Sequence, residues 1–166
     1  MNTVDTDTSL ERGIEGATDG AIALRLTGFE RPLALTLDAL RRYPTVTSDP
    51  FDLKCYTTQR FIRSVDAYRG VLLTDLIADA GLRSEADGDF KRTVFLAIGH
   101  DGYIVTFSWH ELFNTAVGSQ ALVAFECGDR ALSAEEGAPV LLSGADLVPA
   151  PRHVKRLAEI QARVLA

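Results

Sequence analysis

Residue types that mark special classes of protein are scarce in this sequence. Only two of the 166 residues are cysteine, and methionine and tryptophan occur once each. Two cysteines cannot form the disulfide framework of a small secreted scaffold. No apolar run approaches the roughly 18–20 residues that a membrane-spanning helix needs, and no segment repeats at the roughly 20–50-residue period of a solenoid. With 46% hydrophobic residues, the chain has enough apolar side chains to form one folded domain.

Positive charge is also in deficit, because 17 Lys and Arg residues face 23 Asp and Glu residues and the net charge is −6. Binding to duplex nucleic acid needs a cationic face, so we expect no nucleic-acid partner. The charge is uneven, since residues 54–69 and residues 152–163 each carry four basic side chains and one acidic side chain. These two cationic segments would bind a small anion if they meet in space, and would otherwise be solvated surface. The sequence leaves both interpretations open.

Residues 1–19 contain Thr, Asp and Gly and few large apolar side chains, which predicts a flexible acidic arm before a single domain at residues 20–166. The arm lacks the basic start and apolar stretch of a secretory signal. We therefore expect a cytoplasmic protein, or a periplasmic one if a leader has been removed, with no membrane insertion. In a reducing compartment both cysteines would be free thiols.

Hydrophobic periodicity predicts mostly strands, with three short helices between them. Residues 61–68 and 152–165 fit a strand or a helix equally well. The pattern lacks the strand–helix alternation of a parallel doubly wound sheet. It predicts a mixed α+β domain, mostly a β sandwich or barrel-like sheet with a few short helices. The expected strands are 21–28, 51–57, 92–99, 103–107, 121–127 and 138–144, and the expected helices are 35–44, 72–82 and 108–113.

Among the residues that could carry chemistry, Cys55 has the most suggestive neighbours. The sequence contains no phosphate-binding glycine loop, zinc motif or serine-nucleophile motif, and its three histidines lack metal-ligand spacing. Cys55 ends a predicted strand beside Lys54 and five residues before Arg60. Positive charge nearby lowers the pKa of a thiol and favours the thiolate that binds metals. The alternative is a small buried side chain, which is the interpretation we favour for Cys127.

A second candidate site follows the loop at residues 144–151, where Arg152, His153 and Lys155 come close together in the sequence. Loop amides, a bidentate Arg and a Lys suit a phosphate or pterin-like anion. The alternative is a surface strand whose charged side chains point into water.

Several short motifs occur in a fixed order along residues 22–164. The single Cys55 is followed by residues 68–82 (YRGVLLTDLIADAGL), 100–112 (HDGYIVTFSWHEL), 137–142 (GAPVLL) and 152–160 (RHVKRLAEI). Their order and spacing resemble the sulfite oxidase-type molybdopterin-binding domain. The sequence departs from that family's pattern at three positions, where it has Thr58, Leu141 and Arg156.

The resemblance implies a mixed α+β fold around one molybdenum atom, held by a pterin dithiolene and by the thiolate of Cys55. Arg60, Arg152, His153 and Lys155 would hold the pterin and its phosphate. The cofactor would carry two-electron or oxygen-atom transfer on a small-molecule substrate, with a separate electron-transfer protein as partner. Because fold does not fix function, a cofactor-free module that binds a small ligand or a partner on the same fold is the alternative.

Overall fold

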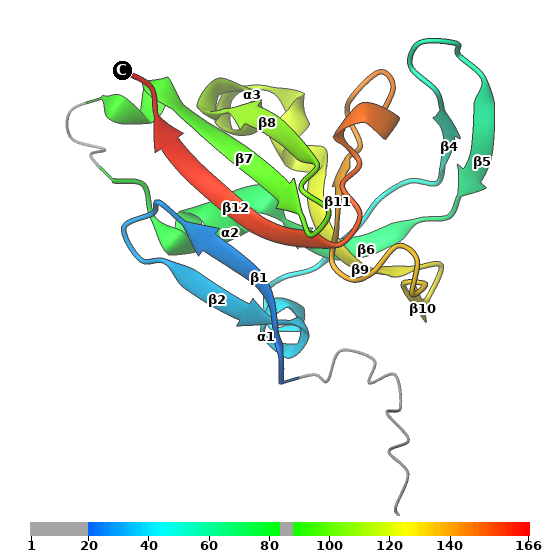
Figure 1. Ribbon diagram of the computed structural model, residues 1–166, viewed down its shortest axis with the longest axis horizontal. Helices are drawn as coiled ribbons and strands as arrows, with labels where there is room; N and C mark the ends of the chain where they lie inside the picture. The colour runs from blue at the N-terminus through cyan, green and yellow to red at the C-terminus, as the bar shows by residue number, and fades with distance from the viewer. Residues whose placement is uncertain (1–19, 84–87) are drawn as a thin grey trace, which may run out of the picture.

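The structure is a computed structural model that describes residues 20–83 and 88–166, so the arm predicted at residues 1–19 lies outside the described residues. Two five-stranded sheets form the body, and a separate two-stranded hairpin stands beside them (Figure 1). The larger apolar core lies between the two sheets and contains buried side chains from both. The expected α+β class, mostly strands with three short helices, is confirmed.

The first sheet has the strand order β2-β1-β12-β7-β8. The last strand, β12, lies in the middle of this sheet, parallel to β1 and antiparallel to β7. The segment 152–165, which fits a helix or a strand by sequence, therefore forms a strand from residue 157, because paired neighbours on both sides outweigh its helix propensity. The strands are β1 (Ile22–Thr27), β2 (Leu33–Thr36), β7 (Thr93–Gly99), β8 (Ile104–Ser108) and β12 (Leu157–Val164).

The second sheet is centred on β9, which pairs with β6 on one side and with β10 and β11 on the other. Both faces of β9 are buried, because Val123 and Phe125 face the core between the sheets while Leu122 and Ala124 join a second apolar cluster. This explains why the segment reads as a continuous apolar run rather than an alternating one. The strands are β3 (Val46–Thr47), β6 (Tyr68–Leu72), β9 (Ala121–Cys127), β10 (Arg130–Ala131) and β11 (Val140–Ser143).

The three expected helices form; those expected at 35–44 and 72–82 are shorter than their predicted ranges, and the one expected at 108–113 starts and ends one residue later than predicted. In α1 (Leu37–Arg41), the hydroxyl of Thr36 accepts a hydrogen bond from the amide of Ala39 at 3.0 Å and fixes the start of the helix. The expected N-cap, Thr36, is confirmed, while the range 35–44 is too long, because Leu35 belongs to β2 and the helix ends at Arg41.

Helix α2 (Leu73–Ala80) buries Leu76 and Ile77 completely against the core, as its apolar stripe predicts. It ends where Gly81 adopts a φ of +75°, a conformation that favours glycine. Helix α3 (Trp109–Asn114) starts at Ser108 with a capping box. Short 3-10 turns lie at Asp89–Arg92, Ala116–Gln120 and Ala150–Arg152.

The hairpin consists of β4 (Phe51–Lys54) and β5 (Phe61–Val65), and it projects from the body (Figure 1). The strand predicted over 51–57 is too long, because the chain turns after Lys54. The ambiguous segment 61–68 is a strand up to Val65, and a new strand begins at Tyr68. Leu53 and Val65 pack on the outer face of the second sheet and attach the base of the hairpin to the body.

Candidate functional site

Cys55 lies in the turn at the end of the β4–β5 hairpin. Its amide donates to the carbonyl of Arg60 at 2.9 Å, and its carbonyl accepts from the amide of Gln59 at 2.8 Å. Gln59 has a φ of +58°, which closes the turn tightly enough for these two bonds to form. The thiol is therefore held by a hydrogen-bonded turn and is only half-buried.

The turn itself stabilises the thiolate. The hydroxyl of Thr58 donates to the sulfur and lowers the pKa of the Cys55 thiol, and the amides of Thr58 and Thr57 lower it further. The sequence suggested a low thiol pKa from the charges of Lys54 and Arg60. The direction is confirmed and the cause is different, because hydrogen bonds to the charged form favour that form.

Cys127 is also a partly buried free thiol, but the pKa of its thiol shifts in the opposite direction. Its side chain is partly buried against the apolar cluster beneath the hairpin, and its Sγ lies 3.6 Å from the carbonyl oxygen of Asp66. Burial raises the pKa of the Cys127 thiol, and the carboxylate of Glu136 raises it further. Of the two thiols, Cys55 is therefore the one whose surroundings favour the thiolate.

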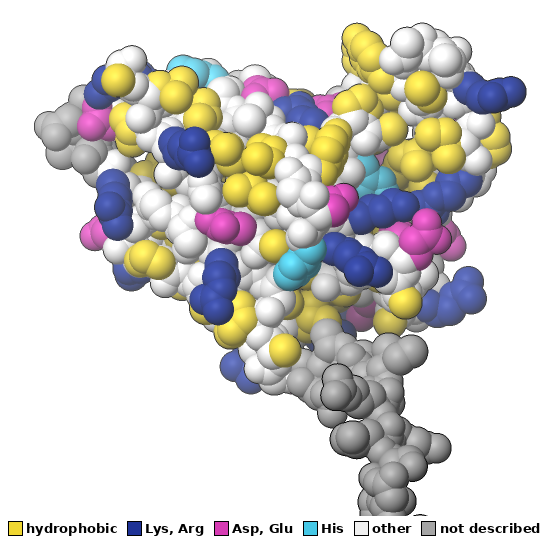
Figure 2. Space-filling model, in the orientation of Figure 1, with side chains coloured by type: hydrophobic (Ala, Val, Ile, Leu, Met, Phe, Trp, Pro, Cys, Tyr) yellow, Lys and Arg dark blue, Asp and Glu magenta, His cyan; other side chains and the backbone are white. Residues whose placement is uncertain are grey.

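A pocket of about 340 Å³ lies between the hairpin and the loop that follows β11. Figure 2 shows the hairpin standing clear of the body, with hydrophobic side chains over much of it and Lys and Arg side chains near its foot. The pocket is lined by Phe51, Asp52, Lys54 and Gln59 from the hairpin and by Gly144, Asp146, Leu147, Val148 and Pro149 from the loop.

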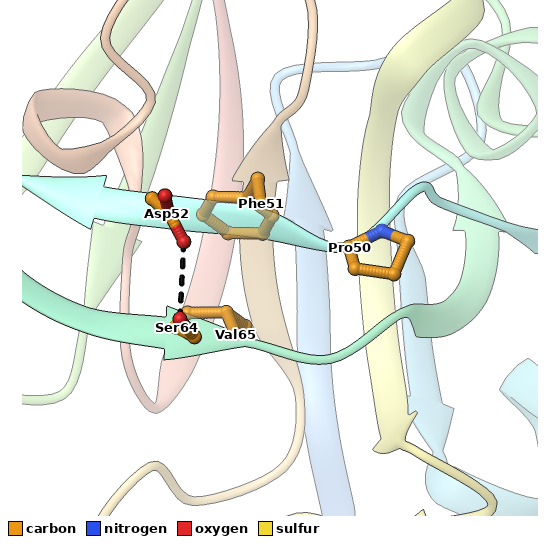
Figure 3. A pocket seen from close by; sticks show the side chains of 5 residues that line it. All are labelled: Pro50, Phe51, Asp52, Ser64 and Val65. Carbon is orange, nitrogen blue, oxygen red and sulfur yellow. Dashed lines mark hydrogen bonds between the residues drawn. The ribbon is translucent and has the colours of Figure 1, made fainter.

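A second hollow, of about 320 Å³, lies at the base of the hairpin (Figure 3). Within it the Ser64 hydroxyl donates to the Asp52 carboxylate at 3.0 Å, so the one charged group in its lining already has a partner. The pocket beside the Cys55 turn is the better candidate for a bound molecule.

Arg152 is not free to bind an anion. Its Nε and Nη2 donate to the two carboxylate oxygens of Asp146 at 2.7 and 2.5 Å, and its Nη1 donates to Glu111 at 2.8 Å. The guanidinium also lies over the ring of Phe107, 4.4 Å from its centroid. The cofactor-binding role predicted for Arg152 therefore has to be restated: two carboxylates neutralise its charge, and it ties the pocket loop to β8 and α3.

His153 is nearly buried, at 8% exposure. Burial lowers the pKa of the imidazole to about 4, so the ring is neutral at pH 7. It packs edge-on against Tyr68, with ring centroids 5.7 Å apart, and its Nε2 lies 3.5 Å from the phenol oxygen. A neutral ring in this position supplies no positive charge to a phosphate.

Lys155 and Arg60 remain accessible. The Nζ of Lys155 lies 3.6 Å from a carboxylate oxygen of Glu135, a side chain that is 86% exposed and can move aside. Arg60 is exposed and makes no ion pair within the described part of the chain. In the described residues no hydrogen bond or ion pair joins Cys55 to Arg152 or Lys155, the residues that the resemblance places around one cofactor. Arg152 reaches the pocket wall only through Asp146.

The residues that sequence reasoning left out of the site are Arg63, Tyr68 and Glu136. Tyr68 is fully buried and its hydroxyl donates to Glu136, whose other oxygen lies 4.0 Å from the guanidinium of Arg63. Burial, followed by the carboxylate of Glu136, raises the pKa of the Tyr68 phenol. A strand assignment for residues 61–65 would have placed Arg63 on the Leu53 side of the hairpin, but the pattern there was ambiguous.

Comparison with known proteins identifies the family of this domain. The family model described as the oxidoreductase molybdopterin binding domain matches residues 17–164. The chain belongs to this family. Its fold also matches the crystal structure of the sulfane dehydrogenase SoxCD from Paracoccus pantotrophus, with a TM-score of 0.63 and 21% sequence identity. No curated protein matches the sequence.

The match to SoxCD covers 92% of this chain and 40% of that chain, so this molybdopterin-binding-type domain spans less than half of the SoxCD chain. At this identity the likeness shows the fold alone. None of the helices in the described residues is long and apolar enough to cross a membrane.

The family implies a molybdenum-pterin cofactor, and the donor set here fits its metal. A thiolate is a ligand type that soft transition-metal sites use, and the turn around Cys55 lowers the pKa of its thiol. The described residues contain no group of three His, Cys, Asp or Glu side chains that could hold a metal alone. Arg60 and Lys155 are the accessible basic side chains for the anionic groups of the pterin. Leu141, which stands where the family pattern has an arginine, is completely buried.

Proposed function

We propose that this chain is a molybdenum-pterin oxidoreductase domain in which Cys55 supplies the thiolate ligand of the metal. The observation that carries the proposal is the hydrogen-bonded turn that lowers the pKa of an accessible thiol beside a pocket. Because the protein offers this one soft donor and no cluster of further ligands among the described residues, most of the metal's ligands would come from the pterin dithiolene.

The cofactor, when bound, supplies two-electron or oxygen-atom transfer on a small substrate, with a separate electron-transfer protein as partner. The protein's own residues then have three tasks. Thr58 and the turn amides hold the sulfur in its charged form. Arg60 and Lys155 bind anionic groups of the pterin through charge-assisted hydrogen bonds. Arg152, bound to Asp146 and Glu111, keeps the pocket loop in place.

The test is metal analysis of protein purified from a host that makes the pterin. We expect about one molybdenum per chain, as for a single stoichiometric site, and its loss in Cys55→Ser. The control is Cys127→Ser, which should keep the metal because Cys127 lies in the apolar cluster. Retention of molybdenum in Cys55→Ser, or equal loss in both variants, would refute thiolate ligation by Cys55.

The second candidate is a cofactor-free module that binds a small ligand or a partner. It is favoured by one set of observations: the expected anion contacts are missing, because Arg152 is neutralised and His153 is uncharged. Folded wild-type protein without molybdenum from the same host would support this function and exclude the first.

A further inference from the structure

The hairpin that carries Cys55 touches the body through few groups, and one of them is polar. Arg63 of β5 is paired directly with Leu53 of β4, and such paired residues project from the same face of a hairpin. Leu53 packs on the second sheet, so Arg63 also projects toward the body. Its Nη2 lies 4.0 Å from Oε1 of Glu136. Within the described residues this is the only ion pair between residues 51–65 and the body.

Glu136 is well placed to anchor the hairpin, because it is itself fixed on every side. Its second carboxylate oxygen accepts a hydrogen bond from the hydroxyl of Tyr68, a residue with no exposed surface. Its amide donates to the hydroxyl of Ser133 at 3.2 Å, and its carbonyl accepts from the amide of Arg156 at 2.9 Å. Only 13% of the Glu136 side chain is exposed, compared with 40% of the Arg63 side chain.

We propose that Glu136 is a positioning residue, which sets the orientation of the Cys55 hairpin relative to the body by holding Arg63 against Tyr68. A carboxylate that accepts from a buried phenol keeps one orientation, so the guanidinium that it attracts has a fixed docking point. The importance of this orientation for metal binding rests on the function proposed above, whereas the positioning itself does not.

The ion pair alone would contribute little to stability, because Arg63 is partly exposed and pairs of this kind are weak. Its effect is on geometry. Leu53 and Val65 make non-directional apolar contacts at the base of the hairpin, and these leave it free to tilt. Glu136 adds the attraction of a fixed carboxylate at a different point of the same face, and this second point of attachment resists a tilt that the apolar contacts alone would allow.

The experiment measures the distance distribution between two nitroxide labels by pulsed electron spin resonance on the full chain. One label is placed on Cys55, in a background of Cys127→Ser so that no other native thiol reacts. The other is placed at Ile104→Cys, an exposed position on β8 of the first sheet. Circular dichroism confirms that each variant is folded.

With Glu136 intact we expect one narrow distribution. Glu136→Ala should roughly double its width, since an element that loses one of its points of attachment samples more orientations. Arg63→Ala should broaden the distribution by the same amount. Because Arg63 is partly exposed, this variant should fold even if Glu136→Ala does not, so the test remains decisive. Arg63→Lys, which keeps the charge, should preserve most of the narrow distribution.

The matched control is Glu126→Ala, which removes the 3.0 Å ion pair between Arg69 of β6 and Glu126 of β9 without touching the hairpin. It should leave the distribution unchanged. Equal widths in Glu136→Ala, Arg63→Ala and Glu126→Ala would overturn the proposal. The labelled protein is metal-free, so this result does not depend on whether Cys55 binds molybdenum. If metal analysis finds no molybdenum, the proposed function is refuted but the positioning role of Glu136 is not.

Discussion

The two-sheet body and the β4–β5 hairpin are built on opposite principles. In the body, large side chains such as Phe95 and Phe107 have no exposed surface. In the hairpin, Tyr56, Phe61 and Ile62 are 66%, 55% and 54% exposed. The body therefore holds the fold together by apolar burial, and the hairpin contributes little to stability while it carries the thiol.

This division separates stability from chemistry along the chain. Substitutions in the body should change the free energy of unfolding, and substitutions in the hairpin turn should change reactivity. The four predictions that follow test whether the separation is as sharp as the structure indicates, in order of decreasing expected effect.

The largest effect should come from the core helix. Leu76 of α2 has no exposed surface, so Leu76→Ala should lower the free energy of unfolding by about 2–5 kcal/mol through lost burial and a residual cavity. Urea denaturation measures the change. The same deletion in the hairpin, Ile62→Ala, should change stability by less than about 0.5 kcal/mol. A comparable loss in the two variants would show that the hairpin belongs to the cooperative core.

The buried imidazole should make stability depend on pH. The pKa of His153 is about 4 in the folded protein and is ordinarily near 6.5, so the unfolded chain binds more protons between these values. Stability attributable to His153 should therefore be complete above pH 6.5 and fall by up to about 3 kcal/mol as the pH approaches 4.

Thermal or urea unfolding across this pH range measures the effect as a difference between wild type and His153→Gln, because carboxylates titrate in the same range. The variant should show a shallower loss of stability toward pH 4. Parallel curves for the two proteins would show that His153 is accessible to protons in the folded state.

The third prediction compares two of the residues expected to bind the cofactor. Arg152→Ala removes hydrogen bonds to two carboxylates and leaves Asp146, at 15% side-chain exposure, without its partner. This should lower the free energy of unfolding by about 1–3 kcal/mol. Lys155→Ala breaks only a solvent-exposed pair and should change stability by less than about 0.5 kcal/mol. A negligible effect of Arg152→Ala would return that residue to the set of free anion ligands.

The smallest effect concerns the two thiols. Cys55 should react with iodoacetamide at pH 7 at least about tenfold faster than Cys127, because hydrogen bonds in the turn lower one thiol pKa and burial raises the other. Mass spectrometry of the two peptides gives the rates. Thr58→Ala should slow Cys55 and leave Cys127 unchanged. If it alters neither rate, the turn does not control the thiolate.

Local patterns in the sequence predict local structure well here. The apolar stripe of α2 and the capping box of α3 each lie within about ten residues, and both appear as expected. The strand that ends at Gly99, its turn and its partner strand are equally local. Such features depend on backbone preference and on one apolar face, which neighbouring residues specify.

Contacts between distant segments could not be predicted in the same way. The spacing of Ser108 and Glu111 is that of a capping box, and one oxygen of Glu111 does accept from the amide of Ser108, but the other accepts from Arg152, 41 residues later. The sequence shows two cationic segments, but it does not show which of their basic side chains are already paired with carboxylates, as Arg152 is. The family resemblance proposed Cys55 as a ligand, and it gave no sign that Thr58 lowers the pKa of its thiol.

The central place of β12 affects how the protein can be made. Because β12 fills the space between β1 and β7, the first sheet has an open gap until residues 157–164 have left the ribosome. During synthesis the chain therefore exposes two strand edges with unpaired amides and carbonyls, the kind of edge that pairs with other chains. A nascent chain of this domain should depend on chaperones until its last strand emerges.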